Sequence, residues 1–218
     1  MLAGILIAGF AISLPFWLMS TPEEKQHMAQ TSTAKTIMEK STGSLDIKPG
    51  EKDELREMLK PVDSSKSPNF EQEIWIQDIK GLIRKWVPDP DEAEAIARWV
   101  YLYSTRFELS PELILGLISV ESNFDHFAVS NVGARGLMQV MPFWKKELGS
   151  PDDNLFEIET NIRYGCAIVR HYIKRYKKID RALGAYNGSL GRSKYPNKVF
   201  TQMRRFKATR EDSQTKRI

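Results

Sequence analysis

A succession of helical apolar patterns, from Phe70 to Phe206, most constrains the fold of this chain. Apolar residues recur there at three- and four-residue spacing, which gathers them on one face of a helix, and no alternating strand pattern or internal repeat interrupts them. We therefore expect a mainly α domain over residues 70–206. The expected helices cover residues 70–87, 90–103, 110–121, 154–176, 180–186 and 196–206.

Two of these helices carry explicit start signals. Asp89 precedes Pro90, and Ser110 precedes Pro111. A side-chain oxygen at the cap accepts a hydrogen bond from a first-turn amide, and proline suits the first helical position because it has no N–H to satisfy. We expect helices to begin at both prolines.

The apolar face of the helix over residues 110–121 ends in a carboxylate. Ile114, Leu117 and Ile118 follow helical spacing, and the next position on that face is Glu121. Burial and the carbonyl groups at a helix C-terminus both disfavour a charged carboxylate, so we expect a raised pKa. A carboxyl that is partly protonated near neutral pH suits general acid catalysis. From spacing alone, a borderline side chain reaching into solvent is the simpler interpretation.

The two ends of the chain differ from the middle in amino-acid composition. Residues 2–19 are uncharged and almost wholly apolar, which predicts an uncleaved membrane anchor in residues 1–20, with a cleaved signal segment as the alternative. Residues 21–69 are polar and predict a flexible linker that includes one short helical pattern. Residues 207–218 form a polar, basic C-terminal tail.

Composition excludes several kinds of site. Cys166 is the single cysteine, so no intramolecular disulfide is possible, and its helical context predicts a small buried residue. The three histidines are scattered without ligand spacing, so we expect no metal and no cofactor. A net charge of +4 and a pI of about 9.0 fit a polyanionic neighbour such as cell wall, membrane or nucleic acid.

Two further segments combine polar groups with glycine. Ser130, Gly133, Gly136 and Gln139 fall in the loop after Glu121, a mixture of hydroxyl, amide and tight backbone that suits a sugar-binding cleft. Residues 185–188 read Ala-Tyr-Asn-Gly and end a helix with an aromatic ring and an amide. Taken singly, each of these features has an ordinary explanation as a turn, core residue or helix cap.

Together, these segments resemble the lytic transglycosylases. The resemblance rests on Glu121-Ser122, Ser130, Gly133-Ala-x-Gly136-Leu-Met-Gln139-x-Met141-Pro142, Asn161-x-x-x-Gly165 and Ala185-Tyr186-Asn187, and it covers roughly residues 70–206. It implies a lysozyme-like catalytic domain related to goose-type lysozyme, with a catalytic cleft. The implied substrate is peptidoglycan, cleaved between N-acetylmuramic acid and N-acetylglucosamine.

The resemblance also implies a role for each matching residue. Glu121 is expected to be the catalytic acid and base, and Ser130 the hydroxyl beside the muramic acid ring. Tyr186 is expected to hold its hydroxyl near the catalytic carboxyl, supported by Asn187. The residues expected to line the saccharide groove are Gly136, Gln139 and Met141, and Tyr195 belongs to a later tyrosine segment of the family.

The chain departs from the family pattern at His126, where proline is common, and at Gly188-Ser189-Leu190-Gly191, which alters the loop beside Tyr186. Most glycoside hydrolases use two carboxylates. Asp125 is expected to hold a loop amide instead, so the family's mechanism leaves Glu121 to act alone and forms a 1,6-anhydro sugar without water.

Two alternatives stay open at this point. One is a hydrolase of the goose-lysozyme type, and the other is a wall-remodelling module of a secretion or conjugation machine. The expected location is the periplasm, with anchoring in the inner membrane through residues 2–19 and an envelope machine as a possible partner. No nucleic acid partner is expected.

Overall fold

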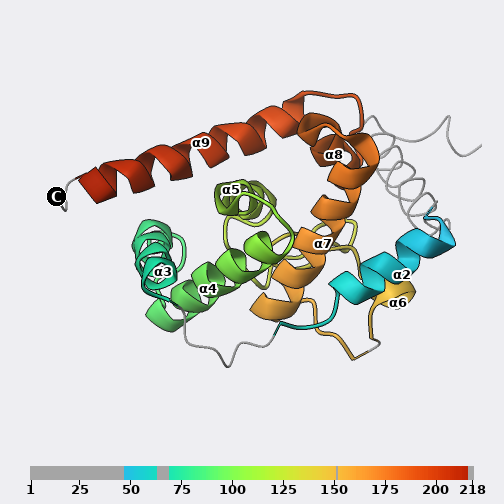
Figure 1. Ribbon diagram of the computed structural model, residues 1–218, viewed down its shortest axis with the longest axis horizontal. Coiled ribbons are helices and arrows are strands. Elements are labelled where there is room, and N and C mark those ends of the chain that lie inside the picture. The colour runs from blue at the N-terminus through green and yellow to red at the C-terminus, as the bar shows by residue number, and fades with distance from the viewer. Residues whose placement is uncertain (1–46, 63–68, 151, 216–218) are drawn as a thin grey trace, which may run out of the picture. The chain divides into compact units, whose positions relative to one another are not determined.

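The computed structural model describes residues 47–62, 69–150 and 152–215, which form helices joined by loops (Figure 1). The expectation of a mainly α domain is confirmed for these parts of the chain. In chain order the helices are α2 (Pro49–Met58), α3 (Phe70–Ile83), α4 (Pro90–Arg106), α5 (Pro111–Glu121), α6 (Pro142–Leu148), α7 (Ile158–Tyr176), α8 (Ile179–Tyr186) and α9 (Lys194–Thr215).

Both predicted helix starts are confirmed. The Asp89 carboxylate accepts hydrogen bonds from two first-turn amides, and α4 begins at Pro90. The Ser110 hydroxyl oxygen accepts a hydrogen bond from a first-turn amide, and α5 begins at Pro111. These caps satisfy amides that have no partner inside the helix, which fixes the point at which each helix begins.

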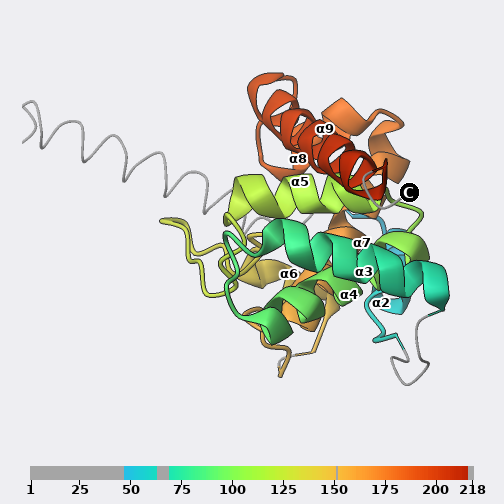
Figure 2. The same ribbon diagram turned by 90° about the vertical axis from the view of Figure 1, so that its left-hand side faces the viewer.

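Helix α5 packs against α9 and α4, and α9 passes across α5, which is seen end-on in Figure 1 and side-on in Figure 2. Its predicted apolar face is confirmed, because the side chains of Ile114, Leu117 and Ile118 are fully buried. Gly116 permits the close approach of α9, since a Cβ atom there would lie 2.9 Å from the carbonyl oxygen of Val199. This contact brings the beginning of α9 to the end of α5.

Helix α7 packs against α4 and α8 and is buried along most of its length. Cys166 lies within it and is fully buried, as expected. The helix begins at Ile158, later than the predicted start at Asn154, because the Asn154 side chain accepts a hydrogen bond at 3.0 Å from the Phe156 amide and forms a turn instead.

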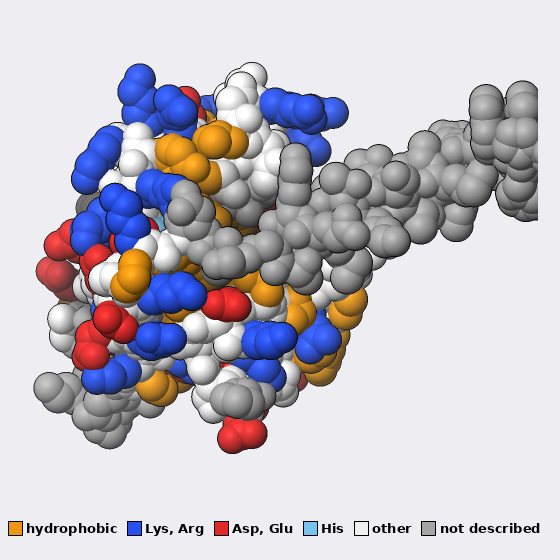
Figure 3. All heavy atoms as spheres, turned by 90° about the vertical axis from the view of Figure 1, so that its right-hand side faces the viewer, with side chains coloured by type: hydrophobic (Ala, Val, Ile, Leu, Met, Phe, Trp, Pro, Cys, Tyr) orange, Lys and Arg blue, Asp and Glu red, His pale blue; other side chains and the backbone are white. Residues whose placement is uncertain are grey.

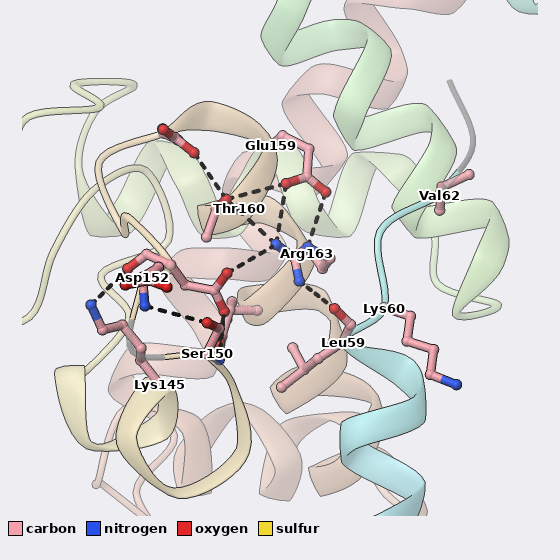
Figure 4. A network of polar contacts seen from close by, with 12 residues as sticks. Leu59, Lys60, Val62, Lys145, Ser150, Asp152, Glu159, Thr160 and Arg163 are labelled. Carbon is pink, nitrogen blue, oxygen red and sulfur yellow. Dashed lines mark hydrogen bonds and ion pairs between the residues drawn. The ribbon is translucent and has the colours of Figure 1, made fainter. Parts of the chain in front are cut away.

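The expectation of a flexible linker over residues 21–69 must be corrected where the structure describes that stretch. Residues 47–62 contain α2, which packs against α7 and α6. Ile47, Leu55 and Leu59 are buried, so the apolar side chains of this polar segment face the domain. The Leu59 carbonyl accepts a hydrogen bond from the buried guanidinium of Arg163 on α7 (Figure 4).

The polar network around Arg163 gathers several segments (Figure 4). Its guanidinium pairs with Glu159 at 3.0 Å and with Asp153 at 3.7 Å. Tyr103 on α4 donates to Glu159, and its own hydroxyl oxygen accepts from the Val62 amide at 3.3 Å. Because a buried cation is stable only when its charge and N–H groups are satisfied, this network holds α2, α4 and α7 in register.

Two helices differ from the sequence expectation. The short helix α6 was not predicted, although Pro142 occupies its first turn. Helix α9 continues to Thr215, so residues 207–215 of the expected tail are helical. Arg210 in this extension pairs with Glu112 on α5 at 3.2 Å, which ties the extension to the domain.

The predicted membrane anchor at residues 2–19 lies outside the described residues. Within residues 47–62, 69–150 and 152–215, the helices lack the combination of length and apolar character needed to cross a membrane. The anchor therefore stays a prediction.

Candidate active site

Glu121 is the last residue of α5 and is partly buried. Burial raises the pKa of its carboxyl to about 7, although a hydrogen bond from Tyr195 acts in the opposite direction. The raised pKa expected from the sequence is thus confirmed, with burial as its cause. At neutral pH the carboxyl is divided between its protonated and ionised forms, so it can both donate and accept a proton.

Two tyrosines approach Glu121, and they do different things. Tyr195, in the first turn of α9, is buried and donates its hydroxyl hydrogen bond to Oε1 of Glu121. Tyr186, at the end of α8, donates instead to the carbonyl oxygen of Met138 at 2.6 Å. The pKa of Tyr186 is raised well above its ordinary value by burial and then by the Glu121 charge.

The hydrogen bond to the carboxyl therefore comes from Tyr195, whereas the family resemblance had led us to expect the Tyr186 hydroxyl near the carboxyl. Tyr186 still lies within electrostatic reach of Glu121 and braces the loop that carries Met138. Both tyrosines lie in motifs of the sequence, but only the packing of α9 against α5 decides which hydroxyl meets the carboxyl.

The loop between α5 and α6 folds back on itself as a compact wall. Two antiparallel β-bridges join Arg135 to Val129 and to Val140. The Gln139 side-chain amide donates to the carbonyl oxygens of Ala128 and Gly136, each at 3.1 Å. The amide N–H groups of Gln139 thus hold the loop together.

Ser130 and Gly136 occupy different places in this wall. The Ser130 hydroxyl oxygen accepts from the Ala134 amide at 3.0 Å, which leaves its O–H as a donor. Gly136 is buried and has a positive φ of 71°, and a Cβ atom there would lie 2.4 Å from Nδ2 of Asn161. Gly136 therefore makes room for Asn161.

Asn161, on α7, connects the wall to the core. Its Nδ2 group donates to the carbonyls of Arg135 at 2.8 Å and Leu155 at 2.6 Å, and its Oδ1 accepts from the Met138 amide at 2.7 Å. The side chain is buried, so these bonds satisfy groups that have no access to water. In the sequence, Asn161 was noted only as part of the Asn161-x-x-x-Gly165 pattern, and that pattern assigned no role to its side chain.

Ser122 is a second residue whose role the sequence analysis did not assign. Its hydroxyl donates to the carbonyl of Leu137 at 2.8 Å, which joins the end of α5 to the loop wall beside Glu121. Asp125, three residues further on, was expected to bind a loop amide. This is confirmed, since its carboxylate accepts a hydrogen bond from the Phe127 amide at 2.8 Å. Both contacts fix the backbone immediately after Glu121.

The remaining predicted groove residues lie at helix ends. Met141 is half-buried and precedes the first residue of α6. Asn187 is exposed and caps α8, with its backbone N–H bonded to the Leu183 carbonyl at 3.1 Å. Across the described parts of the chain, no cluster of three or more His, Cys, Asp or Glu residues is arranged to hold a metal ion.

Comparison with known proteins identifies the family of this region. Residues 100–206 match the Transglycosylase SLT domain family. A transglycosylase of Enterobacteria phage PRD1 is 36% identical over 103 residues, which cover 44% of this chain and 38% of the phage protein. The membrane-bound lytic murein transglycosylase F of Desulfosudis oleivorans is 34% identical over 87 residues, which cover 37% of this chain and 19% of that protein. Residues 100–206 are therefore similar to the SLT domain of these transglycosylases, and the chain spans well under half the length of either relative.

Two solved structures are also similar to part of the chain. An inactive mutant of lytic transglycosylase Slt from Pseudomonas aeruginosa is 26% identical, with a TM-score of 0.38, and the match covers 51% of this chain and 21% of that one. The 70 kDa soluble lytic transglycosylase of Escherichia coli is 20% identical, with a TM-score of 0.39, and the match covers 74% and 30% of the two chains.

The titration of Glu121 gives a direct test of the site geometry. In the native protein its carboxyl should titrate with a midpoint near 7. Tyr195→Phe removes the donor that lowers this pKa, so the midpoint should move to higher pH. Tyr186→Phe leaves the Tyr195 hydrogen bond in place and should move the midpoint less. Carbon-13 NMR of the glutamate side-chain carboxyls measures all three proteins.

The same titration links to stability. The pKa in the folded chain lies above the ordinary value of 4.5, so the folded state binds the Glu121 proton more tightly than the unfolded state. The contribution of Glu121 to stability is therefore fully present below pH 4.5 and is lost as the pH rises through about 7.

For the titration itself, an unshifted Glu121 midpoint in Tyr195→Phe would contradict the hydrogen bond assigned between Tyr195 and Glu121.

Proposed function

We propose that the chain is a peptidoglycan lytic transglycosylase that cleaves the β-1,4 bond between N-acetylmuramic acid and N-acetylglucosamine. The observation that carries the proposal is Glu121: a partly buried carboxyl with a pKa of about 7, held by a tyrosine hydroxyl inside the SLT region. The names of the two relatives, a transglycosylase and a lytic murein transglycosylase, support the same reaction class.

The reaction begins with Glu121 as the general acid. Its protonated carboxyl donates to the glycosidic oxygen while the bond from that oxygen to C1 of the muramic acid breaks. The carbonyl of the 2-acetamido group on the same sugar stabilises the cationic centre that remains at C1. Tyr195 keeps the carboxyl oriented and stabilises the carboxylate that the transfer leaves behind.

The second step uses Glu121 as the general base. Its carboxylate removes the proton from the muramic C6 hydroxyl, and the C6 oxygen bonds to C1. The product carries a 1,6-anhydro ring, Glu121 is protonated again, and no water is consumed. An internal nucleophile has an effective concentration far above that of a nucleophile in solution, so a second catalytic carboxylate is not needed to activate water.

The other predicted site residues are proposed as the walls of the saccharide groove. Ser130 retains a hydroxyl donor for the substrate, and Gln139 and Gly136 shape the loop that carries it. The groups proposed to contact the strand at helix ends are Met141, Tyr186, Asn187 and, through Glu121, Tyr195.

The surface charge supports an anionic wall polymer as the substrate. The chain has 32 Lys and Arg residues against 28 Asp and Glu residues. Figure 3 shows Lys and Arg side chains spread over one face, with acidic side chains between them. We propose action in the periplasm, with residues 2–19 as an inner-membrane anchor and an envelope machine as a possible partner.

Product analysis tests this function. Intact peptidoglycan is digested with the native protein and the fragments are weighed by mass spectrometry. We expect muramic ends that are lighter by one water than hydrolysed ends, because the anhydro ring forms without water. Hydrolysed ends would instead identify a hydrolase of the goose-lysozyme type, and an undigested polymer would contradict enzymatic cleavage altogether.

A further inference from the structure

Beside the candidate groove, the loop after α5 exposes a group of apolar side chains. Phe127 is 67% exposed and Val129 is 61% exposed. The Phe127 ring lies 6.4 Å from the ring of Phe156, and the Arg135 guanidinium lies 5.6 Å from the same Phe156 ring. We call these four residues the Phe127 rim. Single exposed apolar residues are ordinary, but an exposed aromatic cluster beside a cation marks a binding surface.

The Phe127 rim is continuous with the groove wall. Ala128, between the two exposed residues, accepts hydrogen bonds through its carbonyl from the Gly136 amide at 2.9 Å and the Gln139 side chain at 3.1 Å. Figure 2 shows the segment between α5 and α6 projecting beyond the end of α5, where Glu121 lies. A strand bound along this wall can therefore continue onto the rim.

The backbone under the rim is held before any ligand binds. Asp125 accepts from the Phe127 amide at 2.8 Å, and the His126 ring lies 3.8 Å from the Phe127 ring. His126 is in turn hydrogen bonded to Glu92 on α4 at 2.7 Å. An aromatic side chain fixed in this way loses little conformational freedom on binding, so its contact area contributes more to affinity.

The chemistry of the rim matches a glycan strand that carries acidic substituents. Aromatic rings present a large apolar face to the C–H groups of a sugar, and an arginine pairs with carboxylates through parallel N–H groups. Peptidoglycan offers both features at every muramic acid, since each has a sugar ring and a lactyl-linked peptide stem with carboxylates. An uncharged lipid surface would leave Arg135 without a role beside the rings, and an anionic lipid surface is the rival that the test below separates.

We propose that the Phe127 rim binds the glycan strand beyond the disaccharide that is cleaved, with Phe127 stacking on a sugar and Arg135 meeting a stem carboxylate. This inference rests on the proposed function, because the groove must first take peptidoglycan. It predicts that the enzyme prefers long, stem-bearing strands over short ones.

The test compares Phe127→Ala with Phe70→Ala. Phe70 is the first residue of α3 and is 80% exposed, so it matches Phe127 in size and exposure but lies outside the loop. Phe127→Ala should raise KM for long strands about tenfold and leave kcat unchanged, as expected for loss of one aromatic contact. KM for a short oligosaccharide should stay constant, and Phe70→Ala should behave like the native protein on both substrates.

Arg135→Gln separates the two parts of the inference. It should raise KM for strands that keep free stem carboxylates and leave KM unchanged for strands whose carboxylates have been converted to neutral amides. Equal KM values for Phe127→Ala and Phe70→Ala on long strands would overturn the rim assignment, and so would an equal loss on short and long strands. Native cleavage of the short substrate shows that the proposed function stands even if the rim fails. A different outcome would assign the rim to a membrane surface and overturn the inference. In that outcome, Phe127→Ala loses the native protein's binding to anionic vesicles and keeps the native KM on long strands.

Discussion

Glu121→Gln is expected to lower kcat for peptidoglycan cleavage by about 10³-fold or more, because one carboxyl serves as both acid and base in the proposed reaction. The substituted amide cannot donate a proton to the glycosidic oxygen or remove one from the C6 hydroxyl. It is close to the carboxyl in size, and its oxygen can still accept the hydrogen bond of Tyr195. The fold should therefore be kept while turnover is lost.

The matched control for this variant is Glu108→Gln. The Glu108 side chain is 75% exposed and pairs with Arg170 at the surface, so the same chemical change there should leave kcat at the native value. Turnover of purified proteins on intact peptidoglycan measures both variants, and circular dichroism checks the fold. Native turnover by Glu121→Gln would show that another group supplies the proton.

The position of Glu121 was predictable because its signals are local. A cap, a first-turn proline and an apolar face at helical spacing all lie within residues 110–121, and together they fix which side of α5 faces the core. The capping residues Asp89 and Ser110 marked helix starts for the same reason. Sequence reasoning works well where the residues that decide the structure are near one another in the chain.

The hydrogen bond from Tyr195 to Glu121 was not predictable from local signals. Tyr195 and Glu121 are 74 residues apart, and their contact depends on the packing of α9 against α5. The docking of α2 depends in a similar way on Arg163, which is 104 residues from Leu59. The polar composition around α2 predicted a linker because its three buried apolar side chains, Ile47, Leu55 and Leu59, are too few to alter the average.

The loop between α5 and α6 shows a third limit on what the sequence can predict. Two glycines within four residues predicted tight backbone, but the sequence could not distinguish their roles. Both have a positive φ, 85° at Gly133 and 71° at Gly136. A Cβ atom at position 133 would meet nothing within 4 Å, whereas one at position 136 would lie 2.4 Å from Asn161 Nδ2 and 2.5 Å from the Leu155 carbonyl oxygen. Tertiary contact alone separates the two glycines.

This difference yields a prediction about stability. Gly133→Ala should reduce the free energy of unfolding by only about 1–2 kcal/mol, the cost of a left-handed conformation for an L-residue. Gly136→Ala should cost at least about 4 kcal/mol, because the same strain is joined by the displacement of Asn161 from its buried hydrogen bonds. Urea unfolding of both variants measures the two free energies.

Equal losses in the two variants would contradict the assigned packing of Asn161 against Gly136. An unequal loss has a further consequence for the groove. The Asn161 side chain is hydrogen bonded to the carbonyl of Arg135 and the amide of Met138. The carbonyl oxygen of Met138 in turn accepts a hydrogen bond from the Tyr186 hydroxyl. Moving Asn161 therefore shifts the wall on which the saccharide is proposed to bind. Even at a temperature where Gly136→Ala stays folded, its KM should rise while the Glu121 titration midpoint changes little, since Tyr195 reaches Glu121 from α9 and not from the loop.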